Sequence, residues 1–129
     1  MDIKDFVTYE QAFALAKLGF NEETFTYYDK DDTKLQGLDD PYEYHLLDYN
    51  NRYSTSFSAP TLAQVQKWLR KEKGYSIEPI SIFDEDNYIW SGYIVFFKEQ
   101  KLINMDEYKS YEEALSDIIN KCIKLLKYV

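Results

Sequence analysis

One cysteine and one histidine are the residues of this sequence best suited to nucleophilic chemistry. Cys122 falls on the hydrophobic stripe of a C-terminal helical pattern, and His45 falls in a segment with strand character. A Cys–His pair can carry out nucleophilic catalysis, but a free cysteine on such a stripe usually packs as a small hydrophobic side chain. We therefore predict that Cys122 is buried, that the chain has no catalytic residue, and that it is not an enzyme.

An acidic segment has part of the pattern of a calcium-binding loop. Asp29, Asp31 and Thr33 occupy its first, third and fifth positions, where oxygen ligands are needed. The sixth position is Lys34 instead of glycine, and the twelfth is Asp40 instead of glutamate. We therefore predict a solvated acidic loop, with no metal ion and no cofactor.

Basic residues gather in the C-terminal half of one predicted helix: Lys67, Arg70, Lys71 and Lys73. Such residues complement the helix dipole and usually only solvate the helix end. The formal net charge of −8 opposes binding to nucleic acids and to anionic membranes, because both attract positive charge. The same charge is compatible with a basic protein partner.

The composition is that of a globular protein. The chain has 129 residues, of which 45% are hydrophobic and 18% aromatic, and this is enough for one domain with a core. The N-terminus lacks the pattern of a secretory signal, and no apolar run approaches the roughly 20 residues that span a bilayer. We expect a single domain, residues 1–129, in the cytoplasm and without membrane contact.

Three capping boxes mark the starts of three predicted helices. In each box a Ser or Thr is followed three residues later by Gln or Glu, and the two side chains can satisfy backbone N–H groups of the first turn. The predicted helices cover residues 8–20, with a left-handed stop at Gly19, then 61–73 and 110–127. Each helix has one hydrophobic stripe, so each needs to cover only one sheet face.

Segments rich in β-branched and aromatic residues predict the strands. They cover residues 24–29, 42–48, 75–83 and 88–98, with weaker candidates within 49–58 and 99–109. Pro79 indicates an edge strand or a bulge. The predicted fold class is α+β: a mostly antiparallel sheet of about five strands with three helices packed on one face, in the order α-β-β-α-β-β-(β)-α.

The run NYIWSGYIVFF, residues 87–97, is hydrophobic on both faces of its predicted strand. Three helices cannot easily cover both faces of a sheet, so some aromatic surface should remain for a contact. The candidate binding face consists of the side chains on one side of this strand: Tyr88, Trp90, Ile94 and Phe96. Three alternatives remain for what covers this face: the tyrosine-rich segment 42–57, a second copy in a homodimer, or a different partner or ligand.

Three blocks of the sequence carry a resemblance to a known family. They are TYEQAFALAKLGF at 8–20, SAPTLAQVQKWLRKEKGYSI at 58–77, and YKSYEEALSDIINKCIKLL at 108–126. Together they resemble a family of small uncharacterised proteins encoded by bacteriophages and prophages of gut Bacteroidetes. The motifs are helix caps and hydrophobic stripes, so the resemblance implies an origin and a compartment, but no activity and no functional residues.

Our first hypothesis is a non-enzymatic phage or prophage accessory protein that acts by protein–protein contact, through the aromatic sheet face or the acidic surface. A sharper version is that the acidic surface mimics DNA and occupies a basic host protein, which needs carboxylates arrayed on one surface. The alternative is a small-molecule binding module or a small enzyme, with a pocket of about 300 Å³ or more between sheet and helices.

Overall fold

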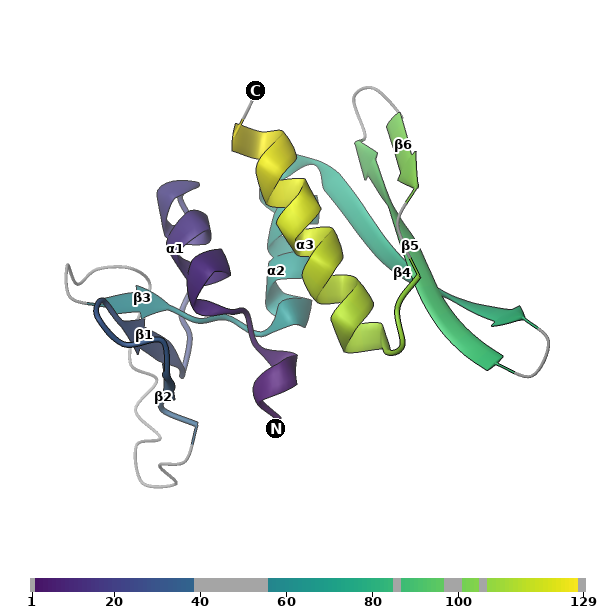
Figure 1. Cartoon of the computed structure of the whole chain (residues 1–129). Coiled ribbons are helices and arrows are strands. Elements are labelled where there is room, and N and C mark those ends of the chain that lie inside the picture. The colour runs from purple at the N-terminus through teal and green to yellow at the C-terminus, as the bar shows by residue number, and fades with distance from the viewer. Residues whose placement is uncertain (1, 39–55, 85–86, 97–100, 105–106, 128–129) are drawn as a thin grey trace. The chain divides into compact units, whose positions relative to one another are not determined.

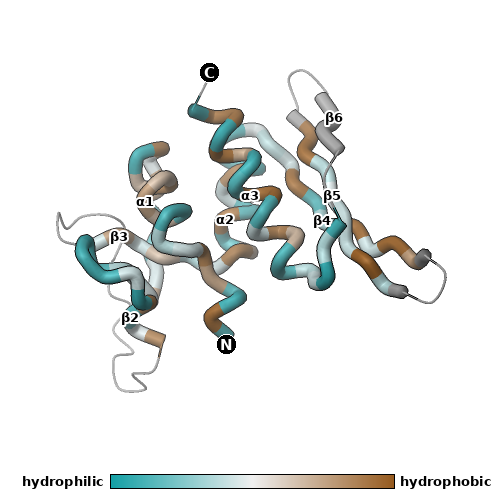
Figure 2. Tube along the Cα trace, viewed as in Figure 1, coloured by the Kyte–Doolittle hydropathy of each residue, from teal (hydrophilic) through white to brown (hydrophobic). Residues whose placement is uncertain are grey.

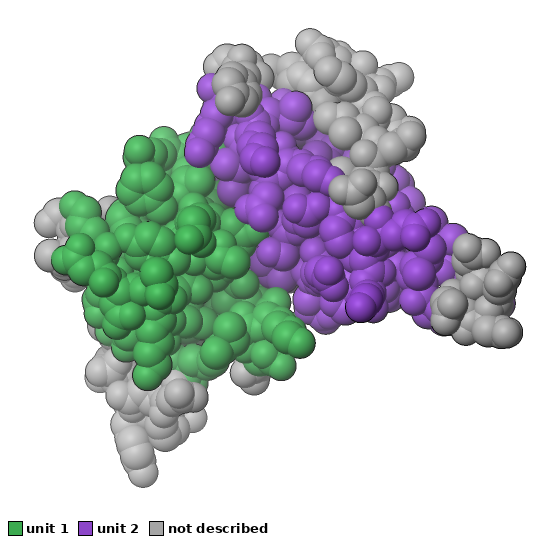
Figure 3. Space-filling model, in the orientation of Figure 1, with its two compact units in different colours: residues 1–61 green, residues 62–129 purple. Residues whose placement is uncertain are grey.

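The structure is a computed structural model that describes residues 2–38, 56–84, 87–96, 101–104 and 107–127. The chain divides into two compact units, residues 1–61 and 62–129 (Figure 3). Each unit combines helix with antiparallel strands (Figure 1), which confirms the predicted α+β class. The single domain predicted over residues 1–129 stays a prediction.

The first unit holds one α-helix and a small sheet among its described residues. Its elements are the 3-10 turn η1 (Ile3–Asp5), α1 (Tyr9–Lys17), β1 (Tyr27–Asp29), β2 (Leu35–Gln36) and β3 (Ser56–Ser58). The strands are antiparallel in the order β2-β1-β3, and α1 packs against β3. Val7, Leu15, Phe20 and Tyr28 are buried in this unit.

Both ends of α1 have the capping interactions that the sequence predicts. The backbone N–H of Gln11 donates to Thr8 Oγ1 at 3.2 Å, and the Thr8 N–H donates to Gln11 Oε1 at 2.8 Å. At the other end Gly19 has a φ of +96°, which a residue with a side chain rarely adopts. The Phe20 N–H then donates to the Leu15 carbonyl at 2.9 Å, as in a Schellman motif.

The second unit holds two α-helices and a three-stranded sheet among its described residues. Its elements are α2 (Leu62–Trp68), the π-helical turn η2 (Leu69–Lys73), β4 (Tyr75–Asp84), β5 (Asn87–Phe96), β6 (Lys101–Asn104) and α3 (Tyr111–Lys127). The strands are antiparallel in the order β4-β5-β6, and α3 packs on β4 and β5. The buried core includes Leu115, Ile118 and Ile119 of α3, with Ile77 and Ile94 from the sheet.

The single sheet of the prediction is corrected by the structure, because the described strands form two sheets. Strands β1, β2 and β3 contain only two or three residues each and pair with one another. Strand β3 pairs with β1, whereas β4, which follows α2 and η2, pairs with β5. Strand β2 lies in a segment predicted as loop, and the predicted strand 42–48 lies outside the described residues.

Candidate functional site

The long hairpin of β4 and β5 is attached to the rest of its unit at Trp90. The Trp90 N–H donates to the Tyr108 carbonyl at 2.8 Å, and the Tyr108 N–H donates to the Trp90 carbonyl at 2.6 Å. The Trp90 ring also makes an edge contact with Tyr111, the first residue of α3, with 5.3 Å between ring centroids. Tyr108 thus holds the backbone of Trp90, and Tyr111 contacts its side chain.

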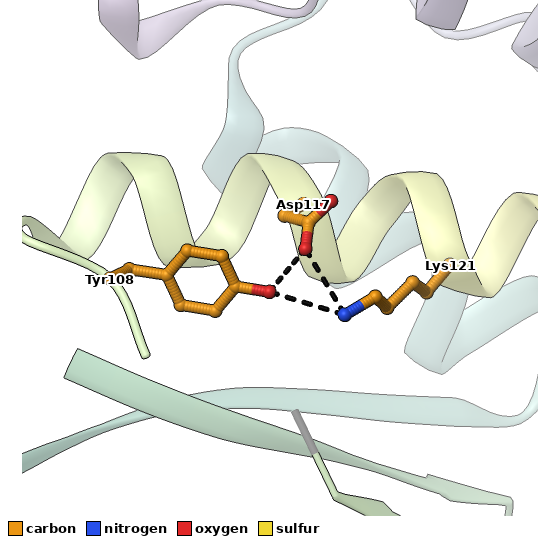
Figure 4. A network of polar contacts seen from close by, with 3 residues as sticks. All are labelled: Tyr108, Asp117 and Lys121. Atoms are coloured by element: carbon orange, nitrogen blue, oxygen red, sulfur yellow. Dashed lines mark hydrogen bonds and ion pairs between the residues drawn. The ribbon is translucent and has the colours of Figure 1, made fainter. Parts of the chain in front are cut away.

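The side chain of Tyr108 joins this attachment to α3 (Figure 4). Its hydroxyl donates to the Asp117 carboxylate, and Lys121 Nζ lies 3.3 Å from the hydroxyl and 3.2 Å from Asp117 Oδ2. Burial, together with the neighbouring Asp117, raises the pKa of Tyr108 above its ordinary 10.0, and Lys121 opposes part of this rise. The phenol therefore keeps its proton at neutral pH and works as a hydrogen-bond donor. This arrangement ties the strand to the helix and provides no tyrosinate base.

The sheet and α3 approach each other closely at Gly92, two residues after Trp90 in β5. Gly92 is buried, and a Cβ built there would overlap the Cδ1 atom of Ile118 and lie 2.9 Å from the Glu78 carbonyl oxygen. Only glycine leaves room for this contact. The hairpin is therefore fixed to α3 over residues 90–94, where Ile94 is 1% exposed.

The direction of the backbone groups along β4 follows from the bonds at Trp90. Along a strand, the N–H and C=O groups of successive residues point alternately toward its two neighbouring strands. The backbone groups of Trp90 point toward Tyr108, so those of Ser91 point toward β4. Ser91 pairs with Ile80, and the register is unbroken, so Ile82 pairs with Ile89. The N–H and C=O groups of Ile80 and Ile82 therefore form hydrogen bonds with β5. The outward residues of β4 are therefore the odd-numbered ones, including Pro79, Ser81 and Phe83.

Two independent observations agree with this assignment. The Ile77 carbonyl, which should point outward, accepts a hydrogen bond of 2.8 Å from Gln66 Nε2 of α2. Pro79 has no N–H, and it falls at an outward position, where the missing donor breaks no bond to β5. Of the two alternatives predicted for Pro79, an edge strand or a bulge, the structure has the edge strand, since β4 is the terminal strand of its sheet among the described residues and its register with β5 is unbroken.

Beyond the attachment at Trp90, the hairpin continues as a two-stranded ribbon, residues 80–84 and 87–89, which we call the distal ribbon. Its exposed fractions are 40% for Ile80, 42% for Ile82, 68% for Phe83 and 67% for Tyr88. Ile80 and Ile82 lie on the face turned away from α3, and Phe83 and Tyr88 form an edge-to-face pair on the other face. Figure 2 shows hydrophobic segments along this part of the hairpin.

The four residues of the predicted binding face have different positions in the structure. Ile94 belongs to the core, and Trp90 is half-buried against Tyr111, so the side that carries them is the side covered by α3. Tyr88 lies on the same side but beyond the helix, and is exposed. The side chain of Phe96 lies outside the described residues. Of the three residues in this set whose side chains the structure describes, only Tyr88 is clearly open to a partner.

The residues that open onto solvent were missed in β4. The sequence predicts Ile80, Ile82 and Phe83 in a strand but not in a contact surface, because the neighbouring strand 88–98 is richer in aromatic residues. Their signal was present in the run IEPISIFD, where hydrophobic residues follow Pro79 without a charged residue until Asp84. An edge strand, with one unpaired side, was one of the two alternatives that Pro79 indicated.

The residues considered for nucleophilic and metal chemistry do not form a site in the described part of the chain. Cys122 is fully buried, and burial raises the pKa of its thiol to about 12, so its predicted place in the core is confirmed. His45 lies outside the described residues. Within the described ranges, no group of three or more His, Cys, Asp or Glu side chains could hold a metal ion.

Comparisons with protein-family models, with curated proteins and with solved structures give no match for this chain. Among the residues that the structure describes, no helix has the length and apolar character needed to cross a bilayer.

Proposed function

We propose that the protein acts by contact with another protein and that the distal ribbon is the contact surface. The observation that supports this best is the exposure of four hydrophobic side chains on one short ribbon, with Ile80 and Ile82 on one face and Phe83 and Tyr88 on the other. Eight large hydrophobic side chains are exposed in the described part of the chain, and half of them lie here. Clustered exposed hydrophobic side chains are typical of interaction sites.

The attachment of the hairpin suits a surface of this kind. Trp90 and Gly92 fix the base of the ribbon to α3, and the distal part projects beyond these contacts. A preorganised ribbon loses little conformational entropy when a partner binds. Binding of a protein partner by the distal ribbon requires no catalytic residue.

The origin implied by the resemblance, a phage or prophage of gut Bacteroidetes, is part of this proposal and suggests a host protein as the partner. The version in which carboxylates mimic DNA stays a prediction, because it requires an array of acidic side chains on one surface.

Affinity capture from a Bacteroidetes lysate, read by mass spectrometry, tests the contact. The variant is Ile82→Asp, which places a charge on the distal ribbon, and the matched control is Ile3→Asp, at a residue 63% exposed in the first unit. We expect Ile82→Asp to lose proteins that the wild type and Ile3→Asp retain. Identical sets from all three proteins would contradict the proposal.

A further inference from the structure

We propose that the outer edge of β4 at Ser81–Phe83 binds an extended protein segment as an added strand, and that this segment is basic and partly hydrophobic. The inference rests on the proposed function and names the chemistry of the partner at the same ribbon. It is carried by the direction of the backbone groups, by the side chains that flank them, and by the charge of the hairpin.

Among the residues that the structure describes, the outer edge of β4 is open beyond Pro79. Closer to the base, the Ile77 carbonyl already accepts from Gln66, and Pro79 has no donor to offer. Ser81 and Phe83 each direct one N–H and one C=O outward, and β4 has no neighbouring strand on that side in the described part of the chain. Unpaired edge groups of this kind are the template for strand addition. The edge therefore offers two donors and two acceptors to an incoming strand.

The side chains beside this edge define the pattern of the incoming strand. Ile80 and Ile82 lie on the face turned away from α3, and Phe83 lies on the opposite face. Side chains of neighbouring strands that share a face contact one another. A segment with hydrophobic residues at alternate positions would cover the two isoleucines and reduce their contact with water.

The charge of the hairpin selects a basic segment. Residues 75–96 contain four acidic residues and no basic one: Glu78, Asp84, Glu85 and Asp86. The sequence of the hairpin therefore offers negative charge, and no positive charge, to lysine or arginine of an incoming strand. A second copy of the chain would bring the same acidic residues, and like charges oppose such a pairing.

The test uses a short capped peptide that alternates valine with lysine, titrated into the whole protein and followed by NMR. We compare Ser81→Pro with Ser81→Thr. Proline removes one outward N–H without breaking a bond to β5, as Pro79 does in the natural sequence, whereas threonine keeps the N–H. We expect binding that slows exchange of the Ser81 and Phe83 amides, and a Kd raised about tenfold or more in Ser81→Pro alone.

Two further peptides keep the test decisive if Ser81→Pro is poorly folded. One has N-methyl groups on alternate residues, which block backbone pairing, and the other replaces lysine by glutamate. Both should bind the wild-type protein at least about tenfold more weakly. No binding of the lysine peptide, or equal binding of either control peptide, would overturn the inference. Self-association of the wild-type protein that Ser81→Pro abolishes would also overturn it, in favour of a second copy.

The outcome is separate from that of the proposed function. If Ile82→Asp loses its captured proteins and Ser81→Pro retains them, contact through the distal ribbon stands and strand addition is refuted.

Discussion

Trp90 and Tyr108 exchange two backbone hydrogen bonds, of 2.8 and 2.6 Å, although they belong to segments eighteen residues apart in the sequence. This pair divides the hairpin into two parts. Toward the base, the sheet is sealed by α3 around Gly92 and Ile94. Toward the tip, Phe83 contacts only the ring of Tyr88 across the hairpin among the ring pairs of the described residues, and Ile82 and Phe83 remain exposed.

The Tyr108 hydroxyl should contribute to the stability of the second unit. Tyr108→Phe removes the hydrogen bonds to Asp117 and Lys121 and leaves the ring in place. We expect the free energy of unfolding to fall by about 1 kcal/mol, the usual net value of such a bond. Urea unfolding followed by tryptophan fluorescence measures it, because Trp68 and Trp90 both belong to this unit. The same loss from Lys109→Ala, on an exposed neighbour, would argue against a specific role of the hydroxyl.

Gly92 should not tolerate a side chain. In Gly92→Ala the added Cβ meets Ile118 and the Glu78 carbonyl, and we expect a loss of about 1–3 kcal/mol in the free energy of unfolding. The comparison is made in the Ile118→Val background, which removes the Cδ1 atom. There the cost of Gly92→Ala should be smaller, but not zero, because the backbone oxygen remains. An unchanged cost in both backgrounds would mean that Ile118 does not set the limit.

Cys122 should make the fold sensitive to alkali. Its pKa is raised from 9.0 to about 12, so above pH 9 the unfolded chain releases the thiol proton while the folded chain keeps it. The contribution of the thiol is complete below pH 9. It should fall by about 1.4 kcal/mol per pH unit between pH 9 and the folded-state value.

The matched variant for this prediction is Cys122→Ala. Its free energy of unfolding is lower at neutral pH because a buried sulfur is lost, but it should decline less steeply above pH 9 than that of the wild type. Every other titratable group is present in both proteins, so the difference in slope isolates Cys122. Folded wild-type protein should also react slowly with thiol reagents, and rapid labelling would place the cysteine outside the core.

The capping box at the start of α1 should be worth about 1 kcal/mol. Thr8→Ala removes the acceptor of the Gln11 N–H, and we expect the free energy of unfolding of the first unit to fall by about that amount. Thr8→Ser keeps the hydroxyl and should lie within a few tenths of the wild type. Urea unfolding followed by far-ultraviolet circular dichroism measures both. Equal losses in the two variants would show that the hydroxyl is not what stabilises the helix.

Local signals in the sequence predicted much of the fold. The capping box at Thr8, the stop at Gly19 and the hairpin around residues 84–87 depend on neighbouring residues, and the structure confirms them. The division into two sheets could not be predicted in this way. It depends on which strands pair, and β-propensity carries little information about pairing.

The candidate site was predicted only in part, for a related reason. Alternation along residues 88–96 correctly separates two hydrophobic faces, but alternation does not say which face a helix will cover. Gly92 decides it, because its missing side chain lets Ile118 of α3 approach from the side of Trp90 and Ile94. The open hydrophobic residues are consequently Ile80 and Ile82, together with the tip residues beyond the helix.

Amide hydrogen exchange along β4, resolved residue by residue by NMR, tests the open edge most directly. Ile80 and Ile82 should be protected by their bonds to β5, while Ser81 and Phe83 should exchange at least about tenfold faster. Protection of all four amides to the same degree would show that the edge is already occupied. That result would contradict the outward direction of the unpaired Ser81 and Phe83 backbone groups.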